Sequence, residues 1–148
     1  MQKIGLVLIF VLGNDRKLAE LRSANSETFL HQQKEAEDVV AILQQSVGKI
    51  ISAEREANGL IITSAYYKAA ENEEITPLDV TVALQSLVGK SQLVIPSGRS
   101  KSGLVGFYDP CIAEAKVLEV RYEFQGRPHY VVVEDSQSLV MPLRAHAE

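Results

Sequence analysis

The chain has 148 residues, of which 46% are hydrophobic, 23% charged and 6% aromatic. This length suffices for one core and leaves little for a second, and the apolar content excludes global disorder. With 15 basic and 19 acidic residues the net charge is −4, which excludes a generic polyanion binder, so we expect no nucleic-acid partner. The one cysteine, Cys111, excludes internal disulfides and an all-thiolate metal site.

Composition divides the sequence into three parts. Residues 1–14 are apolar, residues 15–58 are polar and helix-forming, and residues 59–148 carry most of the glycine, proline and β-branched residues. We therefore predict an apolar anchor-like segment, a long amphipathic helix and a β-rich C-terminal domain.

The apolar segment is too short to cross a membrane alone as a straight helix. About ten helical residues reach about 15 Å, whereas a bilayer core needs about 20 residues. Three interpretations stay open: the core of a secretory signal, a half-depth anchor or partner contact, and a segment packed on the protein's own core. A poor cleavage site at 11–14 weakens the first. We expect a membrane or partner contact through the apolar side chains Ile4, Leu6, Val7, Leu8, Ile9, Phe10 and Leu12.

The polar part predicts one long helix. No proline occurs from Asp15 to Asn58, and Gly59 is expected to end the helix in the left-handed conformation. Apolar residues alternate four and three apart between Ala36 and Ala57, with Glu54 interrupting the row. This seam could pair with another helix as a coiled coil or pack on a globular body. Its expected interface residues are Val40, Leu43, Val47 and Ile50.

The remainder predicts a small antiparallel sheet. Apolar or alternating runs indicate strands at 60–67, 79–85, 92–95, 117–124, 129–133 and 138–141. Gln125-Gly126 separates the two clearest strands and predicts a hairpin turn. The fold class is therefore α+β, with a long N-terminal helix packed on, and leading into, a sheet or sandwich of about six strands.

The loop 97–103 matches neither of the two motifs that it resembles. A phosphate-binding loop needs Gly-Lys-Ser or Gly-Lys-Thr opening a helix, whereas Lys101 here precedes Ser102-Gly103. In a hydrolase elbow the second glycine would fall one position earlier. A solvated loop is the simplest interpretation, and Arg99 and Lys101 are possible contacts for an anion.

No catalytic constellation is visible. The three histidines are dispersed, none lies at metal-ligand spacing, and Cys111 has no clear cationic neighbour to lower its pKa. We expect no cofactor, no metal and no enzymatic activity. The run Gly106, Phe107, Tyr108, Asp109, Pro110 and Cys111 predicts a fixed loop held by aromatic side chains, for which folding is a sufficient reason.

This run and its neighbours resemble the C-terminal domain of the DnaJ homologue subfamily C member eleven family. The similarity covers roughly residues 34–143, through Gly59-Leu60-Ile61-Ile62, Asp79-Val80-Thr81-Val82, Ser91-Gln92-Leu93-Val94-Ile95, the Gly106–Cys111 run and the hairpin from Leu118 to Val133. The resemblance implies a mitochondrial, membrane-associated setting among cristae-organising and assembly proteins. It supplies no catalytic residue.

Two functions follow as hypotheses. The first is a non-enzymatic scaffold or accessory subunit of a mitochondrial membrane assembly, tethered by residues 1–14. No His-Pro-Asp tripeptide occurs, so we expect no stimulation of an Hsp70 ATPase. The second is a soluble module that binds a peptide or an anionic group through the loop 97–103 and the hairpin edge. The sequence leaves the oligomeric state open.

Overall fold

The computed structural model describes the backbone from residue 7 to residue 148 and the side chains from residue 27 onward. The chain divides into two compact units, Met1–Lys34 and Glu35–Glu148. Of the predicted anchor, Ile4 and Leu6 lie outside the described residues, and the side chains from Val7 to Leu12 lie outside the described side chains.

Helix α1 runs from Val7 to Glu56 and begins earlier than the helix expected at 15–58. Asn58, with a φ of 53°, takes the left-handed conformation that we expected of Gly59. Gly59 is required for space instead, because a Cβ there would collide with Ser91 Oγ and Glu54 Oε1. The backbone N–H of Gly59 donates to the Glu54 carbonyl at 2.8 Å and closes the helix end.

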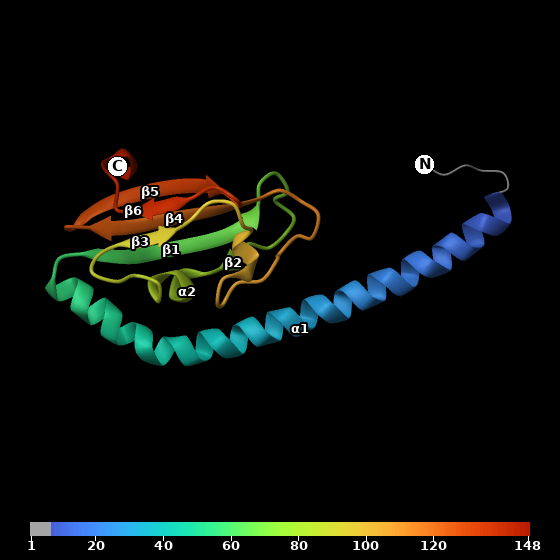
Figure 1. Ribbon diagram of the computed structural model, residues 1–148, viewed down its shortest axis with the longest axis horizontal. Coiled ribbons are helices and arrows are strands. Elements are labelled where there is room, and N and C mark those ends of the chain that lie inside the picture. Colours follow the sequence, from blue (N-terminus) through green and yellow to red (C-terminus); the bar gives the residue numbers. More distant parts are fainter. Residues whose placement is uncertain (1–6) are drawn as a thin grey trace. The chain divides into compact units, whose positions relative to one another are not determined.

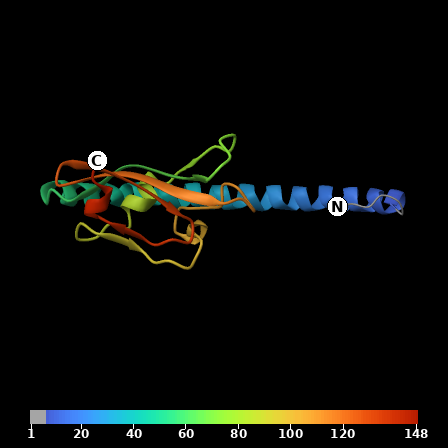
Figure 2. The ribbon, with the colours of Figure 1, turned by 90° about the horizontal axis from the view of Figure 1, so that it is seen from above.

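The second unit contains six antiparallel strands in two sheets (Figure 1). The larger sheet has the order β2-β1-β4-β5, and the smaller one pairs β3 with β6. The strand bounds are β1 Leu60–Ala69, β2 Leu78–Asp79, β3 Leu93–Ile95, β4 Lys116–Phe124, β5 Arg127–Glu134 and β6 Leu139–Met141. The α+β fold and the hairpin at Gln125-Gly126 are thus confirmed. Figure 2 shows the same elements from above.

The strand predicted at 79–85 is wrong. Only Asp79 of that run is extended, in β2, and Thr81–Gln85 form a short helix, α2. Asp79 Oδ1 accepts hydrogen bonds from the N–H of Thr81 at 2.9 Å and from its hydroxyl at 2.7 Å, which starts the turn. Periods of 2 and 3.6 are not separable over so few residues, particularly when Ala83, Leu84 and Gln85 are all buried.

One hydrophobic core joins both sheets and α2. Its fully buried members include Tyr67 and Tyr122 from the larger sheet, Leu93 and Leu139 from the smaller, and Leu84 from α2. Two short 3-10 helices, η1 at Lys101–Gly103 and η2 at Arg144–His146, complete the unit. The core fixes the ends of the strands, where the loops considered next are attached.

Candidate functional site

The structure corrects the prediction for Lys101. This side chain is only 1% exposed, and its ammonium donates to the carbonyls of Glu134, Asp135 and Gln137 at 3.0, 2.7 and 2.6 Å. Burial lowers the pKa of Lys101, against the opposing charge of Asp135. All three donors are therefore occupied in holding the turn after β5. Arg99 is exposed, and its contact with an anion stays a prediction.

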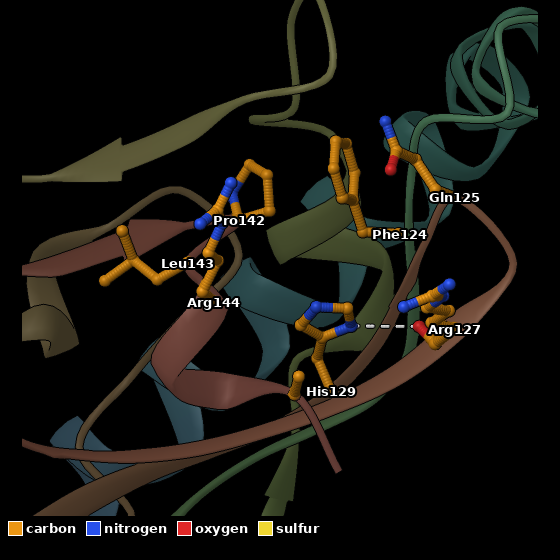
Figure 3. Close-up of a pocket in the computed structure, with 8 residues that line it drawn as sticks. Phe124, Gln125, Arg127, His129, Pro142, Leu143 and Arg144 are labelled. Carbon is orange, nitrogen blue, oxygen red and sulfur yellow. Dashed lines mark hydrogen bonds between the residues drawn. The ribbon is translucent and has the colours of Figure 1, made fainter.

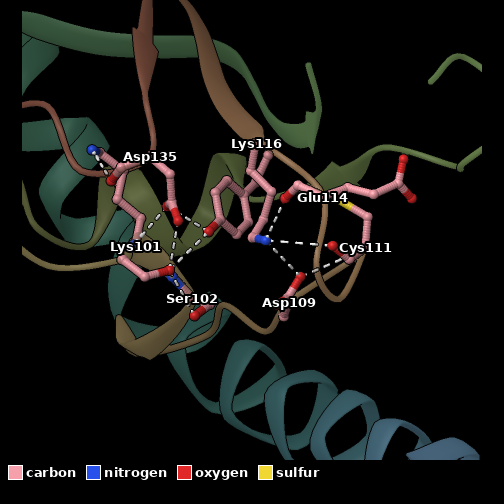
Figure 4. Close-up of polar contacts among 9 residues, drawn as sticks. Lys101, Ser102, Asp109, Cys111, Glu114, Lys116 and Asp135 are labelled. Atoms are coloured by element: carbon pink, nitrogen blue, oxygen red, sulfur yellow. Dashed lines mark hydrogen bonds and ion pairs between the residues drawn. The ribbon is translucent and has the colours of Figure 1, made fainter. Parts of the chain in front are cut away.

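Asp135 lies at the centre of the same network (Figure 4). Its carboxylate accepts hydrogen bonds from Tyr67 Oη at 2.6 Å, Ser100 Oγ at 2.7 Å and the Lys101 N–H at 2.8 Å. Burial alone would raise the pKa of Asp135, but these donors lower it below its usual value. Burial, with help from Asp135, raises the pKa of Tyr67. Every donor here is paired with an acceptor, so the network fixes the loop instead of presenting a reactive group.

The loop Gly106–Cys111 lies between the two helices. Gly106 has a φ of 85°, and a Cβ on it would lie 2.9 Å from Ala83 Cβ of α2 and 3.3 Å from Val40 Cγ2 of α1. Phe107 is buried and its ring centroid lies 5.5 Å from that of Tyr67. Only glycine combines this backbone conformation with this close approach, which explains the first residue of the motif.

The second half of the motif is held by one lysine. The Lys116 ammonium lies 3.3 Å from Asp109 Oδ1 and donates to the Glu114 carbonyl at 2.8 Å (Figure 4). Asp109 also accepts from the N–H of Cys111 at 2.9 Å. Burial raises the pKa of the Cys111 thiol, although Lys116 opposes the shift. This cysteine is therefore a buried thiol with little thiolate character. Of the remaining motif residues, Tyr108 has its pKa raised by burial and by the charge of Glu37 on α1.

The expected helix interface is turned toward the protein's own domain. Val47 is buried and Val40, Leu43 and Ile50 are half-buried, with Ile50 packed against the core. The seam is thus partly covered from within the unit Glu35–Glu148, as in a helix that packs on a globular body, and its pairing with another helix stays a prediction.

Glu54, which interrupts that seam, is a residue whose role the sequence analysis missed. It is 6% exposed, and its carboxylate accepts from the N–H of Leu60 at 2.8 Å, the N–H of Ser91 at 3.1 Å and Ser91 Oγ at 2.7 Å. These bonds tie the end of α1 to the start of β1 and to the turn before β3. The signal available in the sequence was a charged residue at a core-facing position.

Two adjoining open pockets lie beside the hairpin tip. The first has a volume of about 570 Å³ and is lined by Phe124, Arg127 and His129 of the hairpin and by the segment Pro142–Arg144. The second, of about 470 Å³, is lined by Lys90, Val94 and Val140 among others. Phe124 and Pro142 line both. We call the two pockets together the tip cleft. Figure 3 shows Arg127 and Arg144 on opposite sides of His129.

Hydrogen bonds define the protonation of the histidines beside the tip cleft. Tyr122 Oη accepts from the Leu143 N–H at 3.2 Å, so its single proton points to His146 Nδ1 at 2.6 Å. Burial and the neighbouring His129 lower the pKa of His146, consistent with this acceptor role. His129 Nδ1 lies 2.9 Å from the Arg127 carbonyl, which can only accept, so Nδ1 carries a proton.

Apolar side chains continue from the tip cleft onto the smaller sheet. Val94 of β3 and Val140 of β6 are register partners and are 63% and 38% exposed. Leu143, which follows β6 by two residues, is 44% exposed. Adjacent exposed apolar groups of this kind are typical of interaction surfaces.

Within the described residues, no three histidine, cysteine, aspartate or glutamate side chains gather as metal ligands would. Over the same part of the chain, no helix has the length and apolar character needed to cross a membrane.

Comparison with known proteins identifies the family. The family model described as DnaJ-like protein C11, C-terminal, matches residues 20–142. DnaJ homolog subfamily C member 11 of Mus musculus is 42% identical over 138 residues, which cover 89% of this chain and 24% of the mouse protein. The protein of the same name from Pongo abelii is 41% identical over the same shares.

A homolog of the same protein in Dictyostelium discoideum is 38% identical over 123 residues, covering 76% of this chain and 21% of that protein. The matched part of the chain thus spans about a quarter of the length of these relatives. No solved structure matches it. On the family model and these identities, the chain belongs to the family of DnaJ-like C11 C-terminal domains.

Proposed function

We propose that the chain is a non-enzymatic scaffold or accessory subunit of a mitochondrial membrane assembly. Membership of the DnaJ-like C11 family supports a co-chaperone-related role. The mitochondrial membrane setting is what the family resemblance implies. In this role residues 1–14 tether the chain, and the unit Glu35–Glu148 docks on partner subunits.

The observation that carries the proposal is how the domain uses its polar groups. Four charged groups of the domain hold loops through hydrogen bonds or ion pairs: Lys101, Asp135, Asp109 and Lys116. By contrast, Val94 and Val140 of the smaller sheet are exposed. Lys90, Arg127 and Arg144 of the tip cleft form no ion pair or side-chain hydrogen bond within the part of the chain that the structure describes. A domain whose buried charges hold its loops in place, and whose surface presents apolar and basic groups, is suited to binding a partner.

The tether is tested by deleting residues 1–14 and fractionating mitochondria that carry the tagged full chain or the deletion. We expect the deletion to move from the carbonate-resistant membrane pellet to the soluble fraction. Its urea-unfolding midpoint should stay unchanged, because the core lies in Glu35–Glu148. A deletion that stays in the pellet contradicts the tether.

The scaffold role is tested separately on a native gel after gentle solubilisation. The full chain should migrate with a larger membrane complex, in a fixed ratio to its partners. Migration only as the free chain contradicts this role whatever the fractionation shows.

A further inference from the structure

We propose that the tip cleft binds an extended acidic peptide segment of a partner protein, with an apolar side chain of the peptide seated between Phe124 and Pro142. This inference rests on the proposed function, since it names the chemistry of the partner that a docking subunit would hold.

The charged residues that line the tip cleft are all cations. Lys90, Arg127 and Arg144 line the tip cleft, and its lining includes no aspartate or glutamate. None of the three forms an ion pair or a side-chain hydrogen bond with another described residue, whereas Lys68 pairs with Glu119 and Lys116 with Asp109. In a chain of net charge −4, a cleft with cations alone favours an anionic occupant.

Three carboxylates are bonded to, or adjacent in sequence to, lining residues of the tip cleft, and none of them pairs with these cations in the described part of the chain. Glu54 reaches the turn beside Lys90, but Leu60 and Ser91 occupy its oxygens. Glu148 pairs with Arg121 at 3.2 Å. Glu123 is exposed and precedes the half-buried Phe124, so strand alternation directs the two side chains to opposite faces.

A histidine of the tip cleft has a ring nitrogen without a hydrogen-bond partner among the described residues. His129 is 7% exposed, and its Nδ1 donates to the Arg127 carbonyl. Its Nε2 has no hydrogen-bond partner among the described residues. In that part of the chain every fully buried side-chain nitrogen has a partner, so Nε2 itself keeps some exposed surface. This nitrogen is therefore open to the tip cleft that His129 lines, as Figure 3 shows. An extended peptide supplies backbone N–H groups that can donate a hydrogen bond to Nε2.

The shape of the tip cleft suits an extended peptide. Phe124 and Pro142 line both pockets, so they divide the tip cleft into two halves around an apolar junction. Each half falls in the range of about 300–1,000 Å³ that is usual for ligand sites. The exposed Val94 and Val140 form an apolar part of the wall of the second half. A concave site that combines the apolar Phe124 and Pro142 with three cations fits a peptide better than a flat anionic membrane surface.

The test is selection of a displayed library of random octapeptides on the immobilised full chain. We expect recovered sequences to combine aspartate or glutamate with a large apolar residue. The charge-reversed double variant Arg127→Glu, Arg144→Glu should reduce recovery and raise the Kd of a fluorescent recovered peptide at least tenfold. The matched double variant Lys49→Glu, Arg55→Glu carries the same charge change at exposed sites outside the tip cleft and should change the Kd less than twofold.

Folding is checked on all three variants by urea unfolding. His129→Phe tests the open nitrogen, because it keeps an aromatic ring at this position and removes both ring nitrogens. We expect His129→Phe to weaken peptide binding at least threefold. Selection of neutral or basic peptides, or no enrichment at all, overturns the proposal.

An equal loss of peptide affinity in both double variants also overturns the proposal. So does the outcome in which no peptide is selected and Arg127→Glu, Arg144→Glu loses binding to phosphatidylserine vesicles, which would favour a lipid contact. Peptide selection needs no mitochondrial partner, so its failure does not change the native-gel result for the scaffold role. Failure of the native-gel test likewise does not change the result of the peptide selection.

Discussion

Replacing Glu54 tests how the helix is joined to the sheet. Leu60 is 0% exposed, and its N–H donates to the Glu54 carboxylate at 2.8 Å. Glu54→Ala removes this acceptor, and it also removes the acceptor at 3.1 Å from the part-buried N–H of Ser91. A buried unsatisfied donor costs about 1–3 kcal/mol, so the two together predict a loss of about 3–4 kcal/mol. The Ser91 hydroxyl can turn to water and adds little.

Equilibrium unfolding in urea measures this loss. With a slope of about 1–3 kcal/mol per molar, the midpoint should fall by at least about 1 M. Glu54→Gln retains one acceptor oxygen and should lose about half as much stability. Glu56→Ala, on an exposed position of the same helix turn, is the control and should stay within about 0.5 kcal/mol of the parent. If Glu54→Ala and Glu56→Ala unfold at the same midpoint, the carboxylate does not hold this junction.

Three further variants test the loops at Gly106 and Lys101 and the hydrogen bond between Tyr122 and His146. Gly106→Ala places a methyl 2.9 Å from α2 at a φ of 85° and should lower the free energy of unfolding by about 2–4 kcal/mol. In the control Gly103→Ala the methyl meets nothing within 4 Å and should change it little. Equal melting temperatures of the two variants would refute the steric argument. Lys101→Met removes the donor to three carbonyls and should cost about 2–4 kcal/mol in urea unfolding, against almost nothing for the exposed Arg99→Met. Burial lowers the pKa of His146 below its ordinary 6.5, so between the lowered value and 6.5 the unfolded chain takes up a proton that the folded chain does not. The free energy of unfolding should therefore fall as the pH drops through that window, and His146→Asn should reduce this pH dependence. An unchanged pH dependence would contradict a neutral His146 as the acceptor of the Tyr122 hydroxyl proton.

The sequence predicts the elements that have a long, unbroken pattern. The hairpin from Lys116 to Glu134 alternates over two strands around Gln125-Gly126, and it is found in register. The segment after Asp79 is too short for its period to be decided, and burial on all sides of α2 removes the polar face that would mark a helix.

The roles of single polar residues are harder to predict than the elements. Lys101 lies in a loop rich in serine and glycine, where a solvated side chain is the natural expectation. Its burial depends on three carbonyls from residues 134–137, which a sequence with no pairing information cannot bring to it. Glu54 could have been suspected from its place in an apolar seam, but its partners at Leu60 and Ser91 depend on the tertiary fold. The tip cleft likewise combines residues 90–94, 124–129 and 140–147 and has no local signature.

The most direct test of the account is affinity purification of the full chain, tagged at its C-terminus, from gently solubilised mitochondria, followed by cross-linking mass spectrometry. The account predicts stoichiometric recovery in one membrane complex. Cross-links from Lys3 or Lys17 should reach membrane-embedded subunits, and cross-links from Lys90 should reach an acidic segment of a partner. Recovery of the chain as a free monomer without cross-linked partners would contradict the central claim that this domain is a docking subunit.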